Sequence, residues 1–128
     1  MHDMSKLLAL MAASICLSHL AMDMATAQTG ASIAGYWRSP DGNCNRESPD
    51  GPFLIRPDGI ANYHMTCATP LRQEQDGSFS YRGRCTLEDG GGATMAIMLR
   101  PLAADQLVLQ ITRGGRAFQP LHLIRCPR

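Results

Sequence analysis

Few side chains in this sequence could bind a transition metal. His64 and Met65 are adjacent, and His122 lies four residues before Cys126. Copper sites use imidazole and thioether ligands, and zinc sites use imidazole. In an extended strand, however, consecutive side chains point to opposite faces, so His64 and Met65 would diverge. A copper- or zinc-handling protein that uses His64, Met65 and His122 is therefore an alternative interpretation, whereas the favoured one has no cofactor.

A hydrolytic site would need a nucleophile with a supporting base. The sequence contains no Gly-x-Ser-x-Gly motif, and no lysine follows Lys6. His64 could pair with Asp58 or Glu88, but a histidine–carboxylate pair alone specifies no reaction. A small hydrolase with an unrecognised site is thus a second alternative, and a non-catalytic protein is favoured.

The cysteines are better suited to disulfides than to chemistry. Four of them follow residue 27, at Cys44, Cys67, Cys85 and Cys126. No two lie within four residues of each other, which argues against a Cys-x-x-Cys metal or redox site. An even number of cysteines in a small exported domain predicts two structural disulfides.

Turn geometry predicts how one pair is joined. If Glu74 and Ser78 flank a turn at 75–77, residue numbers in the two paired strands sum to 152. Cys67 then lies directly opposite Cys85, on the apolar face of both strands. We therefore expect a Cys67–Cys85 disulfide.

The remaining cysteines would join the first strand region to the last. A Cys44–Cys126 disulfide closes a long loop and so restricts the unfolded chain strongly. Pro70 weakens the strand register that predicts the Cys67–Cys85 pair, because proline cannot donate a ladder hydrogen bond and favours an edge or a bulge. The assignment of Cys44 to Cys126 depends on the same register.

Three other residues are candidates for a binding surface. Trp37, the only tryptophan, could stack on a ligand, but a core plug is favoured because the chain has few other large rings. Arg82 and Arg84 share the predicted outer face of one strand. They could hold an acidic partner or a sugar phosphate, or they could be a solvated face that prevents edge pairing.

These candidates need a scaffold, and the turn signals predict an all-β one. Five Asp-Gly pairs and the pair Gly114-Gly115 separate segments of strand length after residue 40. We expect a small antiparallel meander of about seven or eight strands, a barrel or a sandwich braced by the two disulfides. The predicted strands are 34–39, 53–56, 61–71, 79–87, 93–100, 106–113 and 117–126.

Alternation of apolar and polar residues predicts which side chains face the core. In 61–71 the apolar residues at odd positions are expected inside, at Tyr63, Met65, Cys67 and Leu71. In the last segment His122 shares a face with Cys126 and is interpreted as a core histidine.

The N-terminal residues are typical of a targeting signal. A basic start at 4–6 precedes an apolar run over 7–20, and small residues at 25–27 fit a signal peptidase site. The run is shorter than the roughly 18 residues that cross a bilayer, so no membrane span is expected after cleavage. We expect a cleaved signal peptide at 1–27 and a single domain at 28–128, in the periplasm or secreted.

Charge gives no support for nucleic-acid binding. The formal net charge is +1, and after residue 27 the basic residues are scattered arginines without a basic run.

Three segments carry a resemblance to known proteins. They are Gly-Tyr-Trp-Arg-Ser-Pro-Asp-Gly-Asn-Cys at 35–44, Ile-Arg-Pro-Asp-Gly-Ile at 55–60, and Leu-Ile-Arg-Cys-Pro at 123–127. With the internal cysteines, they resemble small exported four-cysteine proteins of alphaproteobacteria, which are mostly uncharacterised. A looser similarity is to periplasmic inhibitors of lysozymes and proteases, which are disulfide-bonded β-barrels with a tryptophan in the first strand. The resemblance implies a fold and a compartment, and it transfers no active site.

The favoured interpretation is therefore a non-catalytic binding or interaction module of the Gram-negative periplasm. An inhibitor or an envelope-stress accessory would fit, with a protein or a glycan as partner. The sequence predicts no oligomeric state.

Overall fold

Ten antiparallel strands form a single sheet in residues 33–128, the part of the chain that this computed structural model describes. Their bounds are β1 Gly35–Arg38, β2 Phe53–Arg56, β3 Gly59–Ala61, β4 Met65–Cys67, β5 Arg72–Gln73, β6 Phe79–Leu87, β7 Gly92–Ala103, β8 Gln106–Arg113, β9 Arg116–Ala117 and β10 Leu121–Arg125. Eight strands close a barrel in the order β1-β2-β3-β4-β6-β7-β8-β10, because β10 pairs with both β8 and β1. The predicted all-β fold is confirmed, and it is a barrel.

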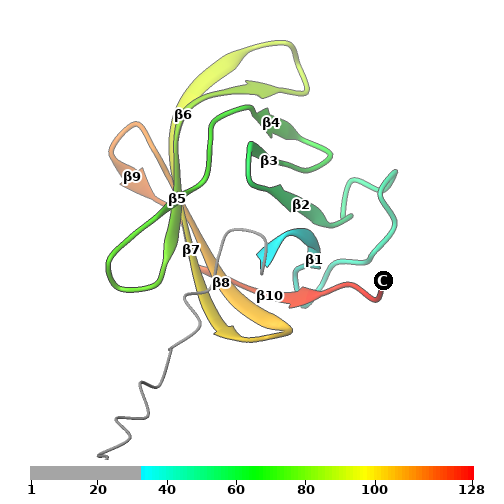
Figure 1. Cartoon of the computed structure of the whole chain (residues 1–128). Helices are drawn as coiled ribbons and strands as arrows, with labels where there is room; N and C mark the ends of the chain where they lie inside the picture. The colour runs from blue at the N-terminus through cyan, green and yellow to red at the C-terminus, as the bar shows by residue number, and fades with distance from the viewer. Residues whose placement is uncertain (1–32) are drawn as a thin grey trace, which may run out of the picture.

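The two shortest strands lie outside the ring. β5 pairs with β6, and β9 pairs with β8. Figure 1 shows these two strands on one side of the molecule and β2, β3 and β4 on the other. Gly114 and Gly115 have φ angles of +58° and +77°, as a type I′ turn requires, and this turn joins β8 to β9. Within residues 33–128, no helix has the length and hydrophobicity needed to cross a bilayer.

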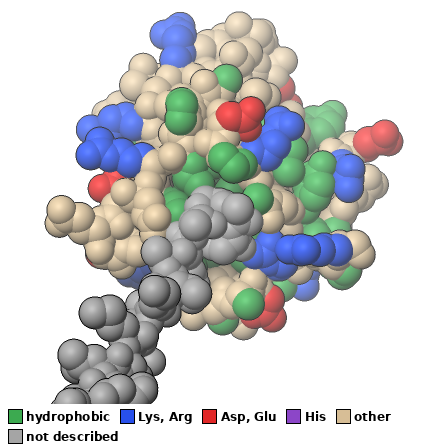
Figure 2. Space-filling view, in the orientation of Figure 1, with side chains coloured by type: hydrophobic (Ala, Val, Ile, Leu, Met, Phe, Trp, Pro, Cys, Tyr) green, Lys and Arg blue, Asp and Glu red, His purple; other side chains and the backbone are tan. Residues whose placement is uncertain are grey.

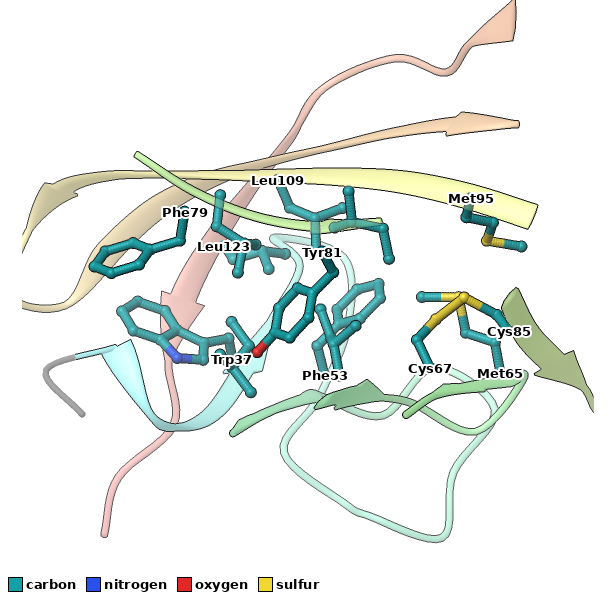
Figure 3. Packing of buried hydrophobic residues seen from close by; sticks show 14 of the residues in the cluster. Trp37, Phe53, Met65, Cys67, Phe79, Tyr81, Cys85, Met95, Leu109 and Leu123 are labelled. Atoms are coloured by element: carbon teal, nitrogen blue, oxygen red, sulfur yellow. A yellow bond between two sulfur atoms is a disulfide. The ribbon is translucent and has the colours of Figure 1, made fainter. Parts of the chain in front are cut away.

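Side chains fill the inside of the barrel. Trp37, Phe79 and Tyr81 lie together near one end, each 1% exposed (Figure 3). Met65 and Met95 pack beside the Cys67–Cys85 disulfide at the other end. An eight-stranded barrel is just wide enough for side chains to fill it. Contacts with a partner therefore have to be made on its outer surface or its loops.

The predicted strand register is confirmed. Cys67 pairs with Cys85, and their sulfur atoms are bonded at 2.03 Å. Further along, Arg72 pairs with Ser80, which keeps the same sum of residue numbers. The predicted strand 61–71 is interrupted at Pro70, because 68–71 separates β4 from β5. The second predicted disulfide, Cys44–Cys126, is formed as well, with a Cα–Cα distance of 5.9 Å.

The prediction for Tyr63 is wrong, since its side chain is 49% exposed. Residues 62–64 form the turn between β3 and β4 instead of continuing a strand. The Asn62 side-chain oxygen accepts hydrogen bonds from the amides of His64 at 2.9 Å and Met65 at 3.0 Å. This local Asn turn overrides the alternation pattern, which holds again at Met65 and Cys67.

Tyr81 provides a titratable probe of the core. Its hydroxyl donates to the carbonyl of Arg56 and lies 3.0 Å from that of Gly59. Burial raises the pKa of Tyr81 from 10.0 to about 12. Because the unfolded chain ionises first, the stabilisation from Tyr81 is complete below pH 10 and is lost as the pH rises to about 12.

We expect Tyr81→Phe to lower the free energy of unfolding by about 1–3 kcal/mol at neutral pH, because the buried Gly59 carbonyl and the part-buried Arg56 carbonyl lose this donor. The same variant should lose the decline in stability between pH 10 and 12 and the ionisation step near pH 12. Urea unfolding at several pH values and absorbance at about 295 nm measure the two effects. An unchanged pH dependence in Tyr81→Phe would contradict this account.

Candidate binding surface

The outer face of β6, β7 and β8 carries a groove, which we call the β6–β8 groove. The strand register aligns its floor residues in two rows, with Ser80, Met98 and Gln110 in one and Arg82, Ala96 and Thr112 in the other. Each hollow along this face is lined by at least one of Arg82, Met98 and Gln110, and the central hollow is lined by all three, so the hollows adjoin one another. The groove is therefore positioned by the three longest strands of the barrel.

Elements outside the ring border the groove on both sides. On one side stands the 69–74 segment with β5, beside a hollow of about 420 Å³. On the other stand β9 and the loop at 118–120, beside a hollow of about 380 Å³. The open hollow next to Gly114 and Gly115 has a volume of about 660 Å³. The groove is wide and open rather than an enclosed ligand cavity.

Positive charge surrounds the groove. Five exposed arginines line it, one from each of five strands, at Arg72, Arg82, Arg100, Arg113 and Arg116. Within residues 33–128, none of them has a carboxylate within salt-bridge distance, and none donates a side-chain hydrogen bond. Their guanidinium groups are consequently available for an anionic ligand.

The two carboxylates at the groove are already hydrogen-bonded to hydroxyl groups. Glu74 Oε1 accepts from Ser80 Oγ at 2.6 Å. Asp76 Oδ1 accepts from Ser78 Oγ at 2.5 Å and from the Ser78 amide at 3.0 Å. The hydrogen bonds from Ser78 hold the pKa of Asp76 below its ordinary value, and Arg100 adds a smaller effect in the same direction. Both carboxylates stay ionised, but neither lies within salt-bridge distance of an arginine in the described chain, and the five arginines outnumber them.

The structure places both predicted surface arginines on the exposed face of β6. Arg82 lies in the groove itself. Arg84 lies at one end, where its guanidinium covers Gly92 so closely that an added Cβ would lie 2.7 Å from Nε. In the view of Figure 2, the basic groups are spread over the surface with hydrophobic side chains between them.

Trp37 does not belong to this surface. It is 1% exposed, its Nε1 donates to the carbonyl of Ile33 at 2.9 Å, and the Arg125 guanidinium lies 4.2 Å from its ring centroid. A ring covered in this way cannot stack on a ligand. Trp37 is the core plug that the sequence favoured, and the alternative prediction that it belongs to a binding surface is wrong.

His64 has both ring nitrogens engaged by the protein. Nδ1 lies 3.0 Å from Glu88 Oε2, and Nε2 lies 3.0 Å from the carbonyl of Pro49. The pairing with Glu88 that the sequence suggested is therefore present. In a histidine–carboxylate dyad, the nitrogen that does not contact the carboxylate faces the nucleophile. In His64 that nitrogen is Nε2, and it contacts the Pro49 carbonyl instead. Neither nitrogen is open to a metal in this arrangement.

The other two proposed metal ligands lie elsewhere. Met65 is 7% exposed and points into the core, whereas His122 is exposed on β10 at one end of the groove. The interpretation of His122 as a core residue is wrong, because β10 ends at Arg125 and Leu123 is the side chain that points inward. In the described part of the chain, no three His, Cys, Asp or Glu side chains lie close enough to hold a metal ion.

Sequence reasoning missed most of the groove, including Met98, Gln110 and the four arginines at 72, 100, 113 and 116. The alternation of inward and outward side chains could have identified the groove residues that lie in strands. The positions that alternate with the buried Ile97, Leu99 and Leu109 point outward by the period of two.

Comparison of the chain with protein-family models, with curated proteins and with solved structures gives no match. The resemblance to exported four-cysteine proteins therefore stays a prediction. The two disulfides fit an oxidising compartment outside the cytoplasm.

Proposed function

We propose that this protein is an exported, non-catalytic binding module that presents the β6–β8 groove to a partner in the periplasm. The observation that carries the proposal is the set of five arginines without salt-bridge partners in the described chain, which surround a groove on a closed barrel. A rigid scaffold with two disulfides keeps such a surface preorganised, which lowers the entropic cost of binding. Inhibition of a protein, or an accessory role under envelope stress, is one form that this binding would take.

Export is part of the proposal. The signal peptide expected at 1–27 lies outside the described residues, so its support comes from the sequence and from the disulfides. Both disulfides need an oxidising environment to persist.

The chemistry at one end of the groove supports a non-catalytic role. Asp76, Ser78 and His122 line the same hollow there, which is the composition of a catalytic triad. Ser78, however, is 3% exposed and donates its hydroxyl proton to Asp76, whereas a triad serine donates to histidine. Neither the hydrolase nor the metal-handling alternative gains an observation in its favour.

Photo-crosslinking in the native host tests the proposal. We expect p-benzoyl-phenylalanine at Thr94, an exposed β7 position in the groove, to form a discrete adduct in the periplasm. The same group at Thr66, an exposed β4 position outside the groove, is the matched control and should form none. The purified protein should have the intact mass of residues 28–128 with two disulfides. Equal labelling from both positions, or no adduct from Thr94, would refute a partner at this face.

A further inference from the structure

We infer that the ligand of the β6–β8 groove is an acidic, extended segment of a protein. This inference rests on the proposed function, because it names the chemistry of the partner that the groove would bind. It is carried by the charge around the groove, by the position of the arginines relative to β7, and by the side chains of the floor.

The charge at the groove is complementary to carboxylates. Its cations are all arginines, and a guanidinium binds a carboxylate through two parallel hydrogen bonds. Glu74 and Asp76 keep their negative charge while they accept hydrogen bonds from serines, but neither lies within salt-bridge distance of a groove arginine. Five arginines face two carboxylates, so the excess of positive charge favours an acidic ligand over a basic one.

The arginines flank a path along the middle strand. Arg82 on β6 and Arg113 on β8 come from the strands on either side of β7 and line the same hollow. Arg82 lies opposite Ala96 in the outward row, whereas Arg113 lies opposite the buried Met95 at the end of β8. Arg72 and Arg116 stand further out on β5 and β9. A chain laid over β7 would have cations on both sides, and an extended peptide sends successive side chains to both sides.

The floor of the groove suits a peptide better than a sugar. Ala96 and Thr112 are small, and Met98 is 43% exposed at the centre. Methionine is flexible and polarizable, so it adapts to different side chains at binding surfaces. Rings of ligands are commonly held by stacking on aromatic side chains. Among the groove residues described, the exposed rings are Phe118 at the β9 side and His122 at one end, and neither lies on the floor.

The test uses the exported protein with both disulfides formed and a fluorescein-labelled decaglutamate peptide. Fluorescence anisotropy should show binding at about 0.02 M NaCl that weakens strongly at about 0.5 M, because salt screens the charges. Decaglutamine is the uncharged control and should not bind. Polygalacturonate, a carboxylated glycan, is the competing ligand class and should bind more weakly per carboxylate than decaglutamate.

Two variants with the same change in charge locate the site. We expect Arg82→Glu to weaken decaglutamate binding about tenfold, because it removes one ion pair and adds a repulsion. Arg38→Glu, on β1 away from the groove, should change it by less than about twofold. Circular dichroism checks that both variants fold.

The outcomes separate this inference from the proposed function. Equal losses in the two variants, or no binding of decaglutamate, would overturn the acidic-segment inference. Tighter binding of polygalacturonate would assign the groove to glycans and overturn it as well. In each case a specific Thr94 adduct would still support a partner at this face, whereas the proposed function fails if that adduct is absent.

Discussion

Replacing Cys44 and Cys126 together with alanine is expected to lower the free energy of unfolding by about 4.5 kcal/mol. The two cysteines are 82 residues apart, and the loop-entropy relation gives this value for a loop of that length. The disulfide also fixes residues 39–52, which contain no strand, to the end of the barrel. Since a domain of this size is stable by about 5–15 kcal/mol, the loss is a large fraction of the total.

The second disulfide is the matched comparison for this prediction. Cys67 and Cys85 are 18 residues apart, for which the same relation gives about 3.2 kcal/mol. Urea unfolding of the two double variants, with the m-values compared, measures the difference. A larger loss for the Cys67/Cys85 variant would show that packing in the core outweighs loop length, because both of these cysteines are 2% exposed.

Trp37→Ala is expected to cost about 3–5 kcal/mol, as other replacements of a buried large ring do. The change leaves a cavity beside Phe79 and removes the donor to the Ile33 carbonyl. It also removes the ring that the Arg125 guanidinium covers. Urea unfolding followed by far-UV circular dichroism is the suitable measurement, because the variant has no tryptophan to report fluorescence.

Trp37→Phe separates the contributions of this residue. It keeps an aromatic ring in the core but has no ring N–H, so a smaller loss of about 1–2 kcal/mol is expected. If Trp37→Ala cost less than about 1 kcal/mol, the ring would not be the structural plug that its burial indicates.

Much of the fold follows from local signals in the sequence. The turn at 75–77 and the apolar face of the next strand fix one register, and this register places Cys67 opposite Cys85. Once that pair is assigned, Cys44 and Cys126 are the two cysteines after residue 27 that remain to be joined. Tyr63 shows where such reasoning fails, because one Asn side chain is enough to end a strand that alternation would continue.

The groove could not be predicted from the sequence in the same way. A core position is constrained by its neighbours, whereas an outward side chain such as Arg100 or Gln110 is compatible with any solvated face. The five arginines come from strands that are separated in sequence, and only the pairing of β5 through β9 brings them to one surface. Arg82 was identifiable as an outer residue, but its neighbours across the sheet were not.

The double pairing of β10 fixes the order in which this molecule can be assembled. A chain that emerges from its N-terminus can form the hairpins from β2 to β8 as they appear, and Cys67 can meet Cys85 early. β1 keeps an open edge until β10 arrives between it and β8. The Cys44–Cys126 disulfide likewise cannot form before Cys126, 82 residues further along the chain, is available. Until β10 and Cys126 have joined the barrel, the domain exposes a free strand edge and Cys44 lacks its native partner, so assembly depends on protection from aggregation and on disulfide exchange.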